Sequence, residues 1–393
     1  MWLPSADEAR GPDRSSRKDS GSAASTVGRG LAHHIAKIVC CCTQPPMPLS
    51  SLVRQLQAAA LTGELLERSR RRDRLLMRGA GRGCRALVAS AMAQRDKRPL
   101  LVVVPTLEEA GRWTALLELM GWSTTHLYPT SEGSPYEPFD PTSEIVWGQL
   151  QVLSDLIAEP SQANRAIVAT ERCLQPHLPP VKALSERCRI LRRGDQVNLE
   201  ELGETLARLG YDRVSSIDQE GTWSRRGDIV DVFPVSSELP VRLEFFGEEL
   251  DKLREFDPAS QRSLDPIDQL QLTPTGFSPL IADALRDRMP EALDRLLQGQ
   301  DLELLLDGGT PEGMRRLMGL AWQEPASLLD YLGEDCFVVI DERRHGLAHG
   351  QQWLDHAREH HNEMAAERGL NDGDRDRLWP GLLHRDIEEA FGA

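Results

Sequence analysis

Apolar residues in the first half of the chain alternate between unbroken runs and helical spacing. The run PLLVVVP at Pro99–Pro105 is continuous and β-branched, which is typical of a strand buried on both faces of a parallel sheet. A second such run, AIVAT, occupies Ala166–Thr170. Segments with helical spacing lie around these two runs, at 51–72, 84–94, 106–122 and 143–159. Strands that alternate with helices in this way predict a doubly wound parallel sheet.

The pattern changes after about Pro180. A helical segment at 198–211 has Asn198 as its cap and Gly210 as its stop signal, and the strand candidates DIVDVFP and VRLEFF follow it. Six residues join these two candidates, which predicts an antiparallel hairpin. The earlier pattern returns with the apolar run in DCFVVIDERR, which ends at Arg344, and with a helical segment at 350–369.

These changes divide the chain into four segments. Residues 1–46 are polar, rich in Ser, Gly and Arg, and aperiodic, so we expect a disordered extension. Residues 47–178 and 276–393 form the two parts of one split α/β domain with helices on both faces of its sheet. Residues 179–275 form a small α+β module inserted between those parts.

A glycine-rich stretch has the position of a phosphate-binding loop. The sequence GAGRGCRA, at Gly79–Ala86, follows a short strand candidate at Leu75–Met77 and precedes a helical segment. Such a loop cradles phosphates with backbone N–H groups, a Lys and a Ser or Thr hydroxyl. The glycines are present at three positions, but Cys84 and Arg85 replace the Lys and the hydroxyl. The degenerate loop consists of Gly79, Gly81, Gly83, Cys84 and Arg85.

An acidic pair follows the last apolar run of the chain. Asp341 and Glu342 end the strand candidate FVVIDE and resemble the acidic partner of a nucleotide site. A simpler interpretation is an acidic strand end that faces solvent. Because the Lys and the hydroxyl are missing, we do not expect this chain to hydrolyse ATP. We also expect no catalytic residue in it.

The strand VRLEFF presents two different faces. Val241, Leu243 and Phe245 share one face, which we assign to the core, whereas Arg242 and Phe246 share the other. Aromatic residues and arginine dominate binding hot spots, and Arg226 joins the same patch if the neighbouring strands pair. Alternatively, Arg242 forms an ion pair with Glu244 or Glu248, and Phe246 packs under a helix.

Composition narrows the possible functions. The chain has 393 residues, of which 40% are hydrophobic, and no segment is long enough to span a membrane. The net charge of −15 argues against a surface that binds nucleic acid over its whole extent. We interpret the basic run at Arg68–Arg74 as a solvated helix end, and weak DNA binding is the alternative. Seven cysteines show no metal spacing or disulfide framework, even in the triplet Cys40–Cys42. We therefore expect no metal site and a cytoplasmic protein with reduced thiols.

The stretch Arg225–Pro274 carries a specific family resemblance. It resembles the insert module shared by the excision-repair protein UvrB and the N-terminal part of bacterial transcription-repair coupling factor, and the likeness runs from about Met47 to the end. UvrB keeps an intact phosphate loop and a Tyr-rich hairpin that clamps DNA. The degenerate loop, SPYEPFDP at 134–141 and DPASQRS at 257–263 are similar to the coupling factor instead. The resemblance implies a UvrB-like, RecA-like fold for the split α/β domain.

The resemblance also implies a function. In the family this module recruits UvrA to stalled RNA polymerase in transcription-coupled nucleotide excision repair, and the UvrA-contacting positions match Arg226, Arg242 and Phe246. Further regions of the family bind RNA polymerase and DNA and use ATP and Mg²⁺. We do not expect those regions in this chain. We therefore expect a non-catalytic adaptor without a cofactor, which is either a fragment or truncated gene product or a chain whose remainder lies elsewhere. The alternative is a divergent UvrB-type, nucleotide-dependent DNA-remodelling enzyme, because the acidic pair in FVVIDERR is UvrB-like.

Overall fold

The computed structural model describes residues 48–71, 75–160, 162–288 and 299–367, together with 297, 369, 371–373, 375 and 390. The predicted extension at 1–46, the cysteine triplet and the last three residues of the basic run lie outside the described residues. Among the helices that are described, none is long and apolar enough to cross a membrane.

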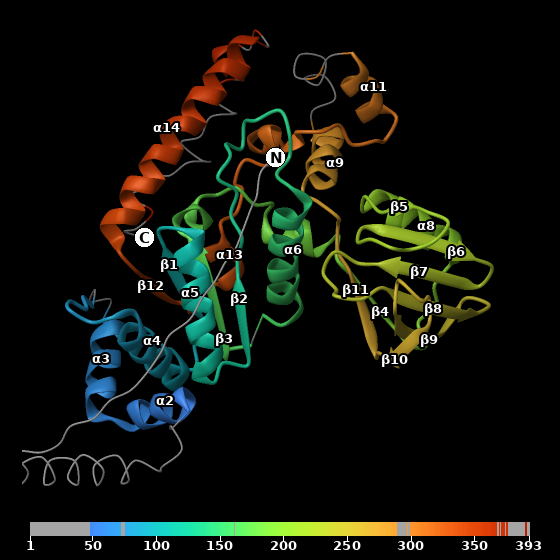
Figure 1. Ribbon diagram of the computed structural model, residues 1–393. Coiled ribbons are helices and arrows are strands. Elements are labelled where there is room, and N and C mark those ends of the chain that lie inside the picture. Colours follow the sequence, from blue (N-terminus) through green and yellow to red (C-terminus); the bar gives the residue numbers. More distant parts are fainter. Residues whose placement is uncertain are drawn as a thin grey trace, which may run out of the picture. The chain divides into compact units, whose positions relative to one another are not determined.

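A four-stranded parallel sheet forms the centre of the α/β part (Figure 1). Its order is β12-β1-β3-β2. Strand β12 lies beside β1 although more than two hundred residues separate them in sequence, so two distant segments complete one sheet. The fold-class prediction of a split α/β domain with an inserted unit is confirmed. The strands are β1 Leu100–Val104, β2 Thr124–Leu127, β3 Arg165–Thr170 and β12 Phe337–Ile340.

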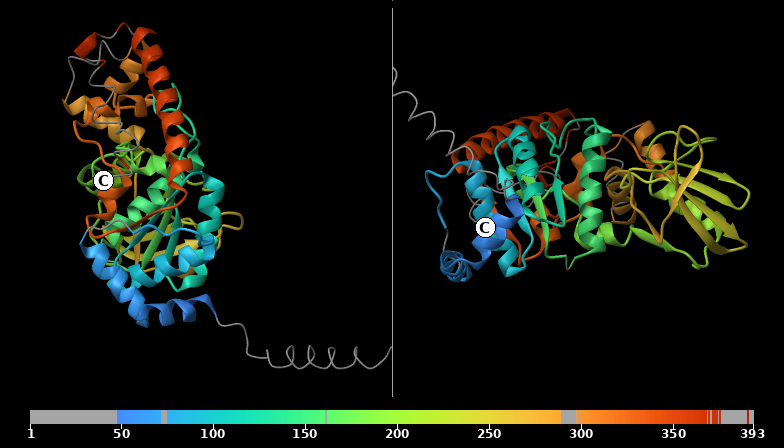
Figure 2. Two further views of the ribbon diagram at one scale, coloured as in Figure 1. Left: turned by 90° about the vertical axis from the view of Figure 1, so that its left-hand side faces the viewer. Right: turned by 60° about the horizontal axis from the view of Figure 1, so that its bottom comes forward.

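Helices cover both faces of this sheet, as Figure 2 also shows. Leu100 and Val102 point into a core with α2, α4 and α5, whereas Leu101 and Val103 point into a larger core with α6, α9, α13 and α14. Alternate side chains of a strand face opposite sides, so the continuous apolar run fills both cores. The helices are α2 Leu49–Ala58, α3 Ala60–Arg70, α4 Arg82–Asp96, α5 Leu107–Leu117, α6 Ser143–Ala158, α7 Val181–Ser185, α9 Ser278–Arg288, α11 Gln300–Leu306, α12 Met318–Ala321, α13 Leu328–Leu332 and α14 Arg343–Glu367, with 3₁₀ turns η1 Glu118–Met120, η2 Glu171–Leu174 and η3 Met314–Leu317.

Two local predictions for the first segment are wrong. The helix predicted over 51–72 is broken at Ala59, whose backbone is extended. There the Arg95 guanidinium donates hydrogen bonds to the carbonyl oxygens of Gln57 and Ala59, which satisfies groups that a continuous helix would use itself. Leu75–Met77 is not a strand: Leu76 is 75% exposed, so this short apolar run has no core to enter.

The inserted module has its own sheets and its own core. Strand β4 Arg189–Arg192 pairs antiparallel with β11 Gln269–Leu272, which brings the two ends of the module together. Between them, six strands form a sheet in the order β10-β9-β8-β7-β6-β5, where the sequence predicted only one hairpin. The other elements of the module are α8 Leu199–Arg208, β5 Asp212–Arg213, β6 Thr222–Arg226, β7 Ile229–Phe233, β8 Val241–Phe246, β9 Glu249–Phe256 and β10 Ser263–Pro266.

One face of the six-stranded sheet packs on α8 and on the β4–β11 pair. Its core includes Trp223 from β6, Val232 from β7 and Leu243 from β8. Asn198 caps α8 by accepting hydrogen bonds from the backbone N–H groups of Glu200 and Glu201, as its position in the sequence predicted. The opposite face is partly covered by a second small core of Ile217, Phe233 and Phe256, and it also carries Asp231 and Arg242.

Candidate functional site

Strand β8 divides its side chains between core and surface as the alternation predicts. Val241, Leu243 and Phe245 are buried in the core of the module. Phe246 is 84% exposed at the end of the strand. The alternative in which Phe246 packs under a helix is therefore wrong, and a large aromatic side chain stands in solvent.

A single buried carboxylate organises the outer face. Asp231 of β7 lies opposite Arg242 of β8 and is only 1% exposed. Arg242 donates from Nε to Asp231 Oδ1 at 2.7 Å and from Nη2 to Oδ2 at 2.9 Å. Arg226 of β6 donates from Nη2 to the same Oδ2 at 2.8 Å. The structure thus brings Arg226 and Arg242 together, and Asp231 replaces Glu244 or Glu248 as the ion-pair partner of Arg242.

The two arginines differ in how much of them a partner can reach. The Arg242 side chain is 15% exposed. Its guanidinium carbon lies 4.7 Å from the centre of the Phe256 ring, and its Nη1 donates a hydrogen bond to the carbonyl oxygen of Gln261. Its hydrogen bonds with Asp231 raise the pKa of the guanidinium. The Arg226 side chain, by contrast, is 58% exposed. Arg242 is therefore held in place, whereas Arg226 keeps hydrogen-bonding capacity toward solvent.

We call the group formed by Arg226, Ile229 and Phe246 the Phe246 surface. Ile229 is 37% exposed and lies opposite Arg226 across the β6–β7 turn. The backbone N–H of Phe245 donates to the carbonyl oxygen of Asp228, so the turn residues and the end of β8 lie at the same end of the sheet. Apolar and cationic groups are exposed together there, which is the composition of a protein-binding surface.

Sequence reasoning missed Asp231 and Ile229. The signal was present, because IVDVF alternates and places Ile229 and Asp231 on the face opposite Val230 and Val232. A carboxylate in the middle of a strand, between two strands that carry arginines, predicts a cross-strand ion pair. This prediction requires knowing which strands pair with β7, and the alternation of a single strand does not show that.

The degenerate phosphate loop leads into α4, but an ion pair occupies the space beside it. Gly81 is the N-cap of α4, Gly79 has φ +70°, and Cys84 is exposed. Arg85 Nη1 lies 2.7 Å from Asp341 Oδ1 and 2.9 Å from Glu342 Oε1. The hydrogen bond from Arg85 lowers the pKa of Glu342. A residue of the loop itself therefore forms ion pairs with both acidic side chains.

Asp341 does not face solvent, so the simpler interpretation of the acidic strand end is wrong for this residue. It is 4% exposed and accepts a hydrogen bond from the Trp113 indole Nε1 at 2.7 Å. Glu342 is half exposed and has φ +46°, a conformation that residues with a side chain rarely adopt. Among the described residues, no group of three His, Cys, Asp or Glu side chains is placed to hold a metal ion.

Comparison with known proteins connects the chain to DNA repair. A family model described as the UvrB interaction domain matches residues 190–276, which include the whole Phe246 surface and Asp231. The chain is 25% identical to the transcription-repair-coupling factor of Bacillus subtilis over 68% of its length, and 27% identical to that of Escherichia coli over 68%. It is 30% identical to the same factor of Mycobacterium tuberculosis over 75%. The chain spans about a quarter of the length of these curated relatives.

Proposed function

We propose that this chain, a homologue of transcription-repair-coupling factors that carries a UvrB interaction domain, docks UvrA through the Phe246 surface. The single observation that carries the proposal is Phe246, an aromatic side chain 84% exposed inside the matched domain. The ring is exposed beside Arg226, and aromatic residues and arginine together are what binding hot spots are enriched in. Covering it would contribute about 2 kcal/mol from the removal of apolar surface from water.

We assign the three predicted contact residues different roles. Phe246 and Arg226 are exposed and would touch UvrA directly, with Arg226 donating to an acidic or carbonyl group of the partner. Arg242 is mostly covered and would position Arg226 through their shared carboxylate, Asp231. The surface would then be ordered before binding, which reduces the entropy lost on association.

Binding of UvrA to the whole chain and to single variants tests the proposal. We expect Phe246→Ala to weaken the complex about tenfold or more, because a truncated hot-spot residue costs about 1.4 kcal/mol or more. Leu264→Ala is the matched control: Leu264 is an exposed apolar residue on β10 of the same module, outside the Phe246 surface. Titration calorimetry gives the affinities, and circular dichroism checks the fold. A folded Phe246→Ala variant with wild-type affinity would defeat the proposal.

In cellular terms, the proposed role is recruitment of UvrA during transcription-coupled nucleotide excision repair. The names of the relatives state a coupling of transcription to repair. We assign contacts with RNA polymerase and DNA, and the ATP-driven motor, to the parts of those relatives that this chain does not match. The chain described above would contribute the UvrA contact alone.

We further propose that the degenerate loop does not hydrolyse ATP. Arg85 already binds both acidic side chains that would otherwise serve a nucleotide-bound Mg²⁺. Calorimetry with Mg-ATP tests this, and we expect no binding tighter than about 1 mM. Tighter binding would favour a UvrB-type nucleotide-dependent enzyme instead. This result is independent of the Phe246→Ala result, so the two experiments separate adaptor from enzyme.

A further inference from the structure

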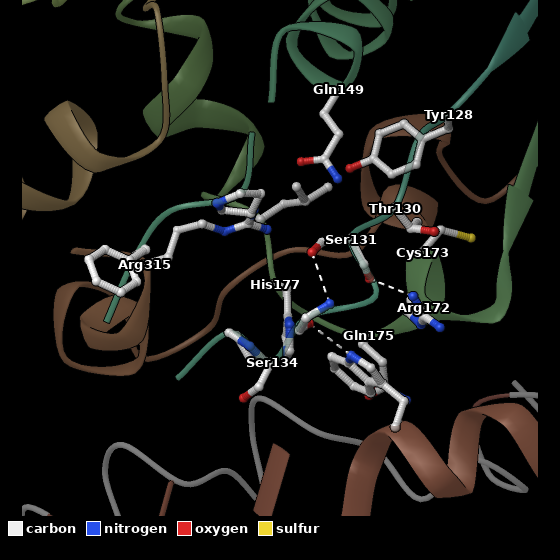
Figure 3. Close-up of a pocket in the computed structure, with 16 residues that line it drawn as sticks. Tyr128, Thr130, Ser131, Ser134, Gln149, Arg172, Cys173, Gln175, His177 and Arg315 are labelled. Carbon is white, nitrogen blue, oxygen red and sulfur yellow. Dashed lines mark hydrogen bonds between the residues drawn. The ribbon is translucent and has the colours of Figure 1, made fainter. Parts of the chain in front are cut away.

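A hollow lies beyond the carboxyl ends of β2 and β3 (Figure 3). Its volume is about 580 Å³, which includes space open to solvent. Tyr128 follows β2, Arg172 follows β3, Arg315 comes from η3 and Trp353 comes from α14. In parallel sheets this edge is where ligands bind, since successive strands end there in loops. No residue of the hollow belongs to the domain matched at 190–276.

Arg315 contributes a cation that no carboxylate of the described residues pairs with. Its Nη1 is buried and has no hydrogen-bond partner in the described part of the chain. The guanidinium carbon lies 5.4 Å from the centre of the Phe277 ring. Asp140 acts on the guanidinium electrostatically; its Oδ2 accepts a hydrogen bond from Ser278 Oγ at 2.5 Å, and its buried Oδ1 has no hydrogen-bond partner among the described residues. Burial lowers the pKa of Arg315, because removing the charged guanidinium from water costs free energy. An anion bound beside the guanidinium would offset part of that cost.

Other polar groups of the hollow are only partly satisfied. Gln149 donates from Nε2 to the carbonyl oxygen of Pro129 at 2.8 Å, while its buried Oε1 has no hydrogen-bond partner among the described residues. Burial raises the pKa of Tyr128, so its hydroxyl stays protonated and can donate. In Figure 3 the polar ends of Gln149 and Tyr128 point toward the same region, near the Arg315 side chain. Arg172 Nε is also buried without a hydrogen bond and lies 3.9 Å from the buried Glu171.

We propose that this hollow binds a ligand through one oxyanion group, a carboxylate or a phosphate, with Arg315 as the anchoring cation. The fixed fork of a guanidinium suits either oxyanion. Tyr128 would add a hydrogen bond, and the walls formed by Phe139, His177 and Trp353 would contact an apolar or planar remainder of the ligand. The inference goes beyond UvrA docking and does not depend on it.

Thermal unfolding of the whole chain in sodium phosphate or sodium acetate tests the proposal. Sodium chloride at the same ionic strength is the reference. We expect at least one oxyanion to raise the melting temperature saturably, with an apparent Kd near about 1 mM. Arg315→Met should weaken this response about tenfold or more, and Arg315→Lys should weaken it less. Arg358→Met is the matched control, because Arg358 is an exposed arginine of α14 paired with Asp355.

A second measurement covers the case in which Arg315→Met does not fold. The Nε–Hε signal of Arg315 in the NMR spectrum of the wild-type chain should move saturably with the same anion. A response to phosphate alone identifies a phosphate ligand, and a response to acetate alone identifies a carboxylate. If neither anion moves the signal, or if a folded Arg315→Met variant responds as the wild type does, the proposal is wrong.

Discussion

At the scale of single residues, Asp231 accepts hydrogen bonds from two arginines while only 1% of it is exposed. A carboxylate in this position is stable only because both cations are present. The arrangement explains how an exposed arginine, Arg226, keeps a defined orientation on an open sheet face. It also makes the Phe246 surface sensitive to a residue that no partner can reach.

We predict that Asp231→Ala lowers the free energy of unfolding by about 3 kcal/mol, because it leaves the Arg242 guanidinium without its buried partner. Asp251→Ala, in the next strand but one, is the control. Asp251 is 44% exposed in its ion pairs with Arg193 and Lys252, so its loss should cost about 0.5 kcal/mol. Urea unfolding of both variants measures the difference, and equal losses would contradict the proposed role of Asp231.

A second residue-scale prediction concerns pH. Burial raises the pKa of Glu171 from its ordinary 4.5 to about 7, while a backbone hydrogen bond and Arg172 act in the opposite direction. Between these pH values Glu171 keeps its proton in the folded chain and has lost it in the unfolded chain. The free energy of unfolding therefore falls as the pH rises from 4.5 to 7, and Glu171 changes it no further above pH 7.

The free energy of unfolding should decrease by about 3 kcal/mol over that range through Glu171 alone. Glu171→Gln cannot ionise, so its unfolding should lack this contribution. The measurement is the difference between wild type and Glu171→Gln in urea unfolding at several pH values. A difference that stays constant from pH 4.5 to pH 7 would show that Glu171 does not keep its proton.

At the scale of elements, the turn before η3 places Arg315 in the hollow. Gly313 is the N-cap residue of η3 and has φ +66°. A side chain at this position would collide with the backbone carbonyl group of Pro138, which belongs to the proline-rich loop after β2. The close approach of these two segments therefore requires glycine.

Gly313→Ala should lower the free energy of unfolding by about 3 kcal/mol, since the variant combines an unfavourable backbone conformation with a backbone collision. Gly308→Ala is the matched control: Gly308 also has positive φ, but a side chain there meets open space. It should lose only about 1 kcal/mol. Similar losses in the two variants, measured by chemical unfolding, would argue against the tight contact with Pro138.

The elements also show what the sequence can predict. Asn198 caps α8 as expected, because a cap depends on residues three or fewer positions away. The faces of β8 followed from alternation, whereas the burial of Asp341 after β12 did not, because Trp113 reaches it from α5, which is distant in sequence. Leu75–Met77 is apolar but does not form a strand, because Leu76 and Met77 are exposed and the segment pairs with no strand of the described chain.

At the scale of the whole molecule, the inserted module is a continuous segment with its own core. The pairing of β4 with β11 holds its two ends side by side, and its core residues all lie between 191 and 272. Hydrogen bonds to the α/β part include that from Trp147 Nε1 to the carbonyl oxygen of Thr275, at 3.0 Å. Such a module has the features of an independently folding domain.

We predict that a polypeptide of residues 188–276 folds alone and unfolds in one cooperative transition. Its affinity for UvrA should lie within about threefold of that of the whole chain, a difference below about 0.7 kcal/mol. Circular dichroism during heating and titration calorimetry measure the two properties. A folded module that binds much more weakly would place part of the UvrA contact in the α/β domain.

The ion pair between Arg85 and the acidic end of β12 limits which residues the loop can carry. Reinstating the Lys and hydroxyl at 84 and 85 would delete the arginine that now neutralises Asp341, whose carboxylate is almost completely covered. Such a double substitution should therefore lower the free energy of unfolding, because it leaves a buried carboxylate without its cation. The same contact fastens α4 to the sheet, so the choice of residue at position 85 is tied to the stability of the fold.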